Sequence, residues 1–404
     1  MLPGKGGVEV ARRLSVVLIF AFNGATLGSW APRTPALAEQ IDAGPGRFGL
    51  ALLAGSVGML LAAAMSGRLV ERFGSRAVIA VSGLAVCGVL PLLGSAPSLA
   101  WFGIALLGLG MTSGALDVAM NMAGVVVERG EGRPIMPLFH AGFSLGALAG
   151  SGTAALAAAA SWSPTWHFTA AAVAGGVLLM AVVRWLPGRT REVKGVSTAA
   201  TGRVSPARRP TLWWLAAIAL CSAIAEGASS DWSALLLATE QGSGEGLAAL
   251  AFAGFTLSMA VARLAGSWAQ ARFGPVRVLV SGAALAGFGL VTAAAVGIPP
   301  VSYVGFLLAG VGLAGCFPIA LGLAGEAGKR SDGSGGEREV AFVTAIAYTG
   351  FLTGPPMIGG IAQLTSLSIS FVAVGVIAAL IAPAAVAATR QLAREQPRAA
   401  DLVR

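Results

Sequence analysis

The chain has 404 residues and a formal net charge of +9, yet 56% of its residues are hydrophobic and only 11% are charged. Soluble domains carry roughly 25% charged residues, so this composition excludes an ordinary water-soluble protein. The positive charge suggests nucleic-acid binding at first sight, but the basic residues alternate between loops and do not gather in one patch, so we expect no nucleic-acid partner.

Twelve apolar runs of about the length that crosses a bilayer follow one another along the chain. We expect all of them to be helices, because a helix satisfies its own backbone hydrogen bonds in lipid and the runs lack the alternation of membrane barrels. The sequence therefore predicts an all-α polytopic membrane protein with twelve transmembrane helices. The predicted spans are 12–39, 47–71, 76–95, 98–127, 134–160, 165–186, 210–239, 246–271, 276–297, 300–327, 338–363 and 367–390.

The basic residues predict the orientation of these spans. With the N-terminus inside, all Lys and Arg residues except Arg33 and Arg47 fall on the inner side. This distribution follows the positive-inside rule, and the even number of spans agrees with it. We expect an integral protein of the plasma membrane with both termini in the cytoplasm.

The first run has some features of a signal peptide, because basic residues precede it and Ala36-Leu37-Ala38 is similar to a cleavage site. Two observations favour a retained span. Asn23 and several prolines interrupt the apolar core, and the run is echoed after the midpoint. The first copy reads Asn23-Gly24 and then Ser29-Trp30, and the second reads Glu226-Gly227 and then Asp231-Trp232.

The echo indicates two related halves. A long polar segment, 187–209, separates residues 1–186 from residues 210–404, and each part contains six predicted spans. A short basic loop ending at Arg76 recurs about two hundred residues later as Arg272-Phe273-Gly274-Pro275-Val276-Arg277. Membrane proteins built by such duplication usually move solutes.

The first of these loops carries a family signature. The chain resembles the major facilitator superfamily, whose first half has Gly-x-Leu-x-Asp-Arg-x-Gly-Arg-Arg/Lys between helices two and three. Here Glu71 replaces the usual Asp and Ser75 replaces one basic residue. Within the family the chain looks closest to bacterial members near the fucose permease. The matching residues are Gly67, Leu69, Glu71, Arg72, Gly74 and Arg76.

The resemblance implies a gate clamp, in which the acidic residue, here Glu71, engages a helix of the other half in the outward-facing state. Arg129 and Arg338 are candidate partners of Glu71. The alternative is that these charges only set the topology. In the second copy Ser267 and Ala271 replace the expected glycine and acid, so its clamp is expected to be weaker or lost.

A second family element lies in the eleventh span and reads Gly-x-x-x-Gly-Pro-x-x-Gly-Gly. It resembles a motif that drug–proton antiporters carry on helix five, the repeat counterpart of helix eleven. Small residues four apart allow close helix packing and proline bends a helix, which suits two halves that rock. Simple tight packing is the alternative. The motif residues are Gly350, Gly354, Pro355, Gly359 and Gly360.

Ionisable residues inside a membrane are costly and usually face a functional cavity. Glu226 falls near the middle of its span, where a carboxyl group can exchange a proton, so it is our first candidate for the proton-coupling site. Asp117 is the second, with Asn121 on the same helix face four residues later. The alternatives are a neutral, hydrogen-bonded Glu226 and a structural Asp117.

Seven further residues complete the predicted site. Several of them have an alternative role besides substrate contact. The alternative for His140 is an interfacial histidine, and for Arg33 it is an anchor at the outer surface. For Asp231 it is a place in the lining of the vestibule, and for the tryptophans it is the outer aromatic belt. The repeat places His140 opposite Tyr348, so the two are expected to flank one inner vestibule. The candidate residues are His140, Asp231, Asn23, Arg33, Trp30, Trp232 and Tyr348.

We predict a proton-coupled secondary transporter of a small organic molecule that works by alternating access, as a monomer in the lipid bilayer. Export by antiport is preferred because of the Gly-Pro-Gly-Gly element, and sugar or carboxylate uptake by symport is the close alternative. A lipid flippase on the same fold is a third hypothesis. No P-loop occurs, so ATP-driven transport is not expected. An enzyme is disfavoured and no cofactor or metal is expected, because the chain has only two histidines and no cluster with metal-ligand spacing.

Overall fold

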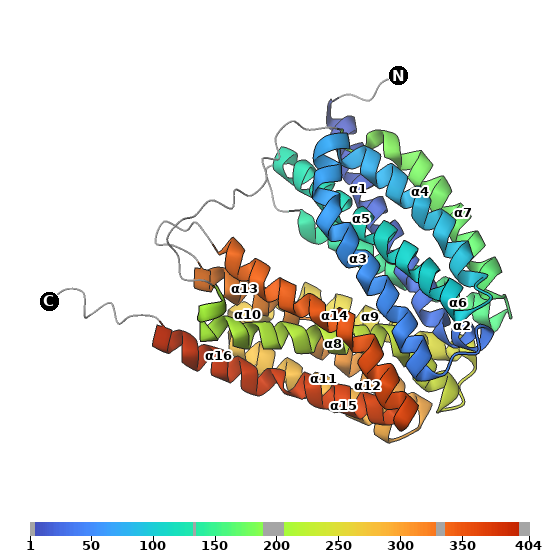
Figure 1. The fold of residues 1–404 in the computed structure, drawn as a ribbon. Coiled ribbons are helices and arrows are strands. Elements are labelled where there is room, and N and C mark those ends of the chain that lie inside the picture. The colour runs from blue at the N-terminus through green and yellow to red at the C-terminus, as the bar shows by residue number, and fades with distance from the viewer. Residues whose placement is uncertain (1–4, 132–134, 189–205, 329–335, 396–404) are drawn as a thin grey trace.

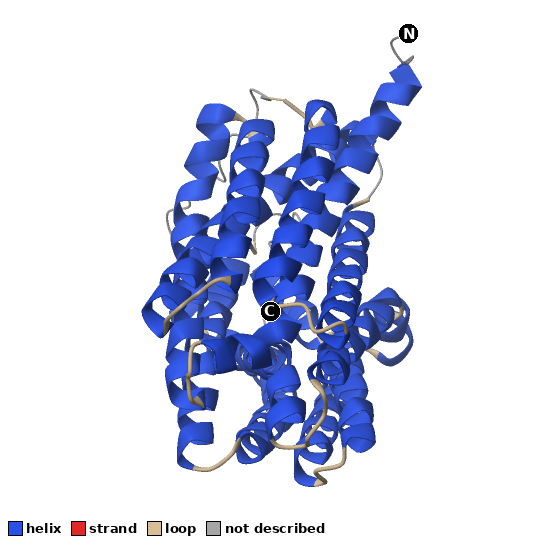
Figure 2. Cartoon of the chain, turned by 90° about the vertical axis from the view of Figure 1, so that its right-hand side faces the viewer, coloured by secondary structure: helices blue, strands red, loops and turns tan. Residues whose placement is uncertain are grey.

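The computed structural model describes residues 5–131, 135–188, 206–328 and 336–395. Within these ranges the only regular elements are helices (Figures 1 and 2). The first half contains α1 Lys5–Trp30, η1 Ala31–Arg33, α2 Thr34–Gln40, α3 Pro45–Phe73, α4 Ser75–Gly94, α5 Leu99–Glu131, α6 Met136–Ala159, α7 Pro164–Val182 and η2 Val183–Trp185. The second half contains η3 Pro206–Arg208, α8 Pro210–Thr239, α9 Glu245–Leu264, α10 Gly266–Phe273, α11 Pro275–Ala295, α12 Pro299–Leu313, α13 Cys316–Gly328, α14 Glu337–Leu364, α15 Leu367–Ala379 and α16 Ile381–Glu395.

The twelve predicted spans are confirmed as helices. In the described ranges, 12 helical segments are long and apolar enough to cross a membrane, and their ends lie within a few residues of most predicted boundaries. Most of the predicted central loop lies outside the described residues. The chain is therefore an all-α polytopic protein.

Three spans of the second half that the sequence presents as single runs are interrupted, and in the first span the short helix η1 separates α1 from α2. Pro318 and Pro383 lack the N–H that would bond to the carbonyls of Ala314 and Ala379, and breaks lie at these places, between α12 and α13 and between α15 and α16. The predicted span 246–271 is also divided, because α9 ends at Leu264 and α10 begins at Gly266. No proline explains this third break.

The two halves share backbone details. Gly74, which begins the turn into α4, has φ 84° and ψ 153°, and Gly274 before α11 has φ 82° and ψ 154°. Glycine adopts this positive φ without the strain that a side chain would bring. Equivalent glycines also meet equivalent carbonyls, because a Cβ on Gly142 would lie 2.9 Å from the oxygen of Val17 and one on Gly350 would lie 3.0 Å from that of Leu220.

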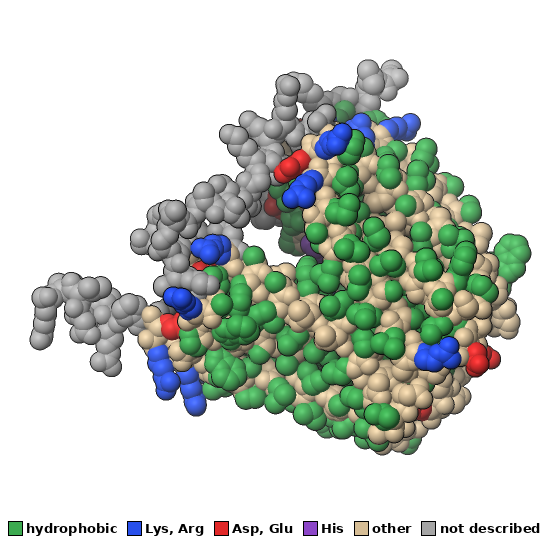
Figure 3. Space-filling model, in the orientation of Figure 1, with side chains coloured by type: hydrophobic (Ala, Val, Ile, Leu, Met, Phe, Trp, Pro, Cys, Tyr) green, Lys and Arg blue, Asp and Glu red, His purple; other side chains and the backbone are tan. Residues whose placement is uncertain are grey.

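The halves converge at one end and diverge at the other (Figure 1). The start of α1 and the end of α16 lie at the divergent end, which we call the terminal side; the convergent end is the far side. Between the halves α3 packs against α14 and α6 packs against α9. A space opens between the two halves on the terminal side (Figure 3). We call this space the hollow.

Candidate functional site

The hollow brings together polar side chains from both halves. The charge of Asp117 on α5 acts on Tyr348 of α14, and Arg263 of α9 acts on His140 of α6, so each pair joins the two halves electrostatically. His140, Arg263 and Tyr348 are exposed, and Asp117 is half-buried. Water-accessible polar groups in membrane-spanning helices are typical of a transport pathway.

Glu226 has a cation beside it. The Nη2 atom of Arg263 lies 3.4 Å from Oε1 of Glu226, and Nε of the same guanidinium donates to the carbonyl oxygen of Ala314 at 3.4 Å. That carbonyl lacks its usual helical partner because residue 318 is proline. Arg263 therefore links a carboxylate on α8 to the break between α12 and α13.

Asp117 and Asn121 lie together, as their spacing predicts. The Nδ2 atom of Asn121 donates to the backbone oxygen of Asp117 at 2.8 Å and lies 3.4 Å from its Oδ1. The short bond to the backbone fixes the amide beside the carboxyl group. The pair thus presents one acidic and one amide group on a single helix face.

His140 packs edge-on against Phe20 of α1, with ring centroids 5.3 Å apart. Across the hollow its electrostatic partner is Arg263, whereas Tyr348 is the partner of Asp117. Both side chains are exposed, His140 on α6 and Tyr348 on α14. The repeat relation between Gly142 and Gly350 could not predict these cross-half partners.

Arg33 occupies a different place from the predicted one. Its side chain is 1% exposed, so it is neither a surface anchor nor open to a substrate in this conformation. Its Nε lies 2.7 Å from Oε1 of Glu245 on α9, and its Nη2 donates to the carbonyl of Trp162 at 2.7 Å. Sequence reasoning missed Glu245, which resembled an ordinary loop charge. The pair joins the two halves on the far side.

The aromatic-belt interpretation is wrong for Trp232. It is 0% exposed and meets Phe48 of α3 edge-on, with ring centroids 5.8 Å apart. Trp30 and Asp231 are half-buried, and Asn23 is buried. In this conformation Trp232 therefore packs at the junction between the halves and has no contact with a lipid headgroup layer.

The gate-motif residues divide into two groups. Glu71 and Arg72 are exposed on the terminal side, and the guanidinium of Arg72 lies 5.3 Å from the ring centre of Phe73. Arg76 donates through Nε to the carbonyl of Leu186 at 2.8 Å, which fastens α4 to the end of the sixth span. Gly67 has no neighbouring atom within 4 Å of an added Cβ in the described chain. Glu71 thus lies on the exposed surface of the terminal side.

The Gly-Pro element of α14 does more than bend one helix. A Cβ on Gly359 would collide with the carbonyl oxygen of Pro45 on α3, and one on Gly49 of α3 would contact Pro355. By contrast, added Cβ atoms on Gly354 and Gly360 meet no described atom within 4 Å. The close packing expected of these glycines therefore holds for Gly359, and it joins the two halves on the far side.

The whole chain is similar to known membrane transport proteins. The family model described as Major Facilitator Superfamily matches residues 14–327 and 215–402. An uncharacterized MFS-type transporter of Yersinia pestis is 32% identical, over 94% of this chain and 97% of that protein. An uncharacterized transporter of Sinorhizobium fredii is 33% identical over 90% and 94%, and the membrane protein MosC of Rhizobium meliloti is 29% identical over 93% and 91%.

Solved structures share the fold at low sequence identity. A bacterial homologue of the human lysosomal transporter Spinster, in an inward-facing and unoccupied conformation, has a TM-score of 0.79 at 14% identity, covering 98% of this chain and 100% of that one. The nucleoside transporter NupG has a TM-score of 0.71 at 12% identity, covering 95% of this chain and 99% of that one.

Proposed function

Because the chain belongs to the major facilitator superfamily, we propose that it moves a small organic molecule across the plasma membrane by alternating access, coupled to protons. The family and its named transporters show an integral membrane transporter. The observation that supports the finer proposal is the hollow between the halves, in which Glu226 pairs with Arg263 and Asp117 lies within electrostatic range of Tyr348. With both termini in the cytoplasm, the hollow opens inward.

The proposed coupling follows from the Glu226–Arg263 pair. Protonation removes the charge of Glu226, which weakens its attraction to Arg263 and frees the guanidinium for a substrate oxygen. An anionic or hydroxylated substrate that bonds to the freed Arg263 binds together with the proton, as in symport, whereas a substrate that bonds to the charged Glu226 competes with the proton, as in antiport. Proton and substrate thereby act on the same ion pair, Glu226 and Arg263, and no cofactor is required.

Alternating access is supported by the far-side junction. There the two halves touch through short contacts: the Arg33–Glu245 pair, the Gly49–Gly359 approach and the Phe48–Trp232 rings. Rigid halves that rock about such contacts expose the central site to one side at a time. In the outward-facing state these contacts part, and Glu71 closes the terminal side.

Export by proton antiport remains our preferred direction, because it rests on the resemblance of the α14 element to the antiporter motif. Uptake by symport is the second candidate. The observation that favours it is the polar lining of the hollow by Asp117, Asn121, His140 and Arg263, which suits a small hydrophilic solute.

The experiment that tests the proposal is substrate-evoked proton flux in proteoliposomes with a trapped pH dye, across sugars, carboxylates, amphipathic drugs and lysolipids. Proton movement opposite to a compound establishes antiport, and movement with it establishes symport. Compound movement in the absence of any proton flux contradicts the coupling. Lysolipid movement between leaflets, in the absence of soluble-compound transport, establishes the flippase alternative.

A further inference from the structure

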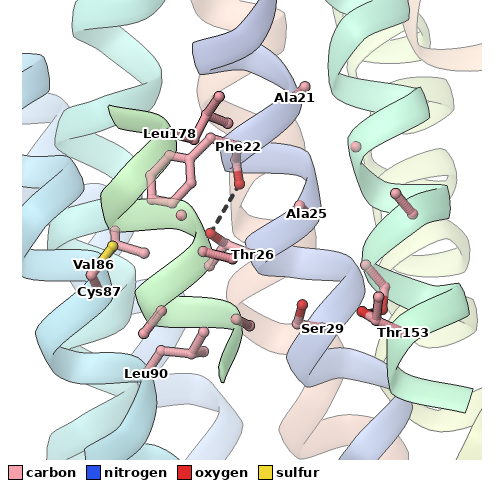
Figure 4. A pocket seen from close by; sticks show the side chains of 17 residues that line it. Ala21, Phe22, Ala25, Thr26, Ser29, Val86, Cys87, Leu90, Thr153 and Leu178 are labelled. Carbon is pink, nitrogen blue, oxygen red and sulfur yellow. Dashed lines mark hydrogen bonds between the residues drawn. The ribbon is translucent and has the colours of Figure 1, made fainter. Parts of the chain in front are cut away.

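A second cavity lies within the first half, away from the hollow. It has a volume of about 300 Å³ and is enclosed by α1, α4, α6 and α7 (Figure 4). This volume is at the lower end of the range of ligand pockets, roughly 300–1,000 Å³. Small apolar residues supply most of its walls. They include Ala21, Ala25, Ala149, Gly150, Ala171 and Ala174.

The cavity faces the bilayer. In the described bundle α6 packs on α1 and α7 packs on α4, but α6 and α7 do not pack along one another, which leaves a groove with α1 as its floor. Leu145 on α6 and Val173 and Val177 on α7 stand beside the groove and are 67%, 63% and 67% exposed. Apolar side chains exposed on spanning helices contact hydrocarbon, so the groove is open to lipid.

Several positions of the groove have larger side chains in the second half. The repeat register is set by equivalent contacts and caps, because Gly24 meets Phe143 as Gly227 meets Phe351, and Ser163 caps α7 as Ser366 caps α15. The larger residues are Trp232 for Ser29, Met357 for Ala149, Ile358 for Gly150 and Val374 for Ala171. The two halves therefore line these positions with different side chains.

Ser29 places one free polar group in this groove. Its side chain is 3% exposed and lines the cavity, yet its hydroxyl makes no hydrogen bond among the described residues. Thr26, one turn earlier, instead bonds to the carbonyl of Phe22 at 3.1 Å (Figure 4). The hydroxyl is open to the cavity and has no partner there, so a ligand oxygen beside Ser29 would give it a hydrogen bond.

We propose that this groove binds one acyl chain of a membrane phospholipid from the far-side leaflet, with the Ser29 hydroxyl donating a hydrogen bond to the ester carbonyl. The geometry favours this orientation. Ser29 lies at the far-side end of the cavity, and the apolar wall continues from it to Ala21, about 12 Å along α1 at 1.5 Å per residue. The polar end therefore points to the headgroups and the apolar end to the bilayer centre.

The test uses photo-crosslinking in proteoliposomes with a phosphatidylethanolamine that carries a diazirine on one acyl chain, followed by peptide mapping. We expect crosslinks concentrated on the groove residues of α1, α6 and α7. Ala171→Phe fills the groove with an aromatic ring and is expected to lower these crosslinks by about tenfold or more. Ser29→Ala removes one neutral hydrogen bond and is expected to lower them about threefold to tenfold.

Val173→Phe is the matched control, because it adds the same ring two residues away on the lipid-facing surface and is expected to leave the crosslinks unchanged. Ala149→Met, at the exposed edge of the groove, serves as a second filling variant if Ala171→Phe misfolds. Crosslinks spread evenly over the exposed helices, or unchanged by both filling variants, would overturn the proposal. The readout is lipid contact alone, so it is independent of whether transport is proton-coupled.

Discussion

The Nε atom of Arg33 lies 2.7 Å from Oε1 of Glu245, and this pair joins the first half of the transporter to the second on the far side. Arg33 is almost completely buried, whereas the Glu245 side chain retains 29% of its exposure. A charge pair between two bodies that rock apart exists in only one of their arrangements. The pair therefore stabilises the state in which the hollow opens to the terminal side.

Glu245→Gln is expected to shift the protein toward the opposite, far-side-open state. The substitution leaves the buried Arg33 without its charge partner and should cost about 1–3 kcal/mol, the usual cost of a buried polar group left unpaired. That is roughly a 5- to 150-fold change in the conformational equilibrium. Spin labels at Ser98 and Thr365, exposed on the far side of each half, measure it as a longer distance.

Glu39→Gln is the control for this shift, because Glu39 is an exposed carboxylate near Glu245 that forms no ion pair with Arg33 in the described part of the chain. It is expected to leave the label distances unchanged. If both variants gave the same distances as the parent protein, the Arg33–Glu245 pair would have no role in the equilibrium.

Gly359→Ala is expected to prevent close packing of the halves. The added methyl group would collide with the carbonyl oxygen of Pro45, so α14 and α3 must separate and the terminal-side-open state loses stability. Gly360→Ala is the neighbouring control, since no described atom lies within 4 Å of its Cβ. We expect slower transport and a longer Ser98–Thr365 distance for the first variant only. Equal behaviour of the two variants would refute a role for this contact.

Glu71→Ala is expected to shift the balance toward the terminal-side-open state. In this structure Glu71 is exposed, so its removal costs little here, while the proposed clamp with the other half in the outward-facing state would be lost. Labels at Arg68 and Arg272, exposed on the terminal side, should report a larger population of long distances. Glu9→Ala, an exposed carboxylate on the same side, controls for charge. An unchanged distribution would remove the clamp assignment.

Arg263→Lys tests whether the positive charge of Arg263 is sufficient, or whether its hydrogen bonds to both Glu226 and the Ala314 carbonyl are needed. An ammonium group keeps the positive charge beside Glu226 but is a point donor, so it does not span Glu226 and the Ala314 carbonyl together. We expect proton-coupled transport to persist at a rate lowered about tenfold, whereas Arg263→Ala abolishes it. Transport by the alanine variant at the parental rate would show that Arg263 is only a structural cation.

The sequence predicts the spans well because each is a long apolar run, and it predicts the Asp117–Asn121 pair because four residues make one helical turn. Proline at 318 and 383 signals two of the breaks in principle, although the apolar runs continue through them. The break after Leu264 has no such signal, so it appears only in the structure.

Contacts between the halves are the part that one sequence does not reveal. Arg33 and Glu245 are separated by more than two hundred residues, and their meeting depends on how two helix bundles tilt. The same holds for Phe48 and Trp232, where burial between the halves replaces the membrane-surface position that a tryptophan near a span end suggests. Local spacing rules contain no information on that tilt.

The central claim, that Glu226 couples proton movement to transport, is tested most directly by comparing the parent protein with Glu226→Gln in proteoliposomes. For a substrate that evokes proton flux, we predict that the variant loses all proton-driven accumulation and the dye signal while it still exchanges labelled substrate across the membrane. Asp117→Asn, measured in parallel, shows whether the loss is specific to Glu226. Undiminished proton-driven accumulation by Glu226→Gln would contradict the account and make Glu226 a structural partner of Arg263.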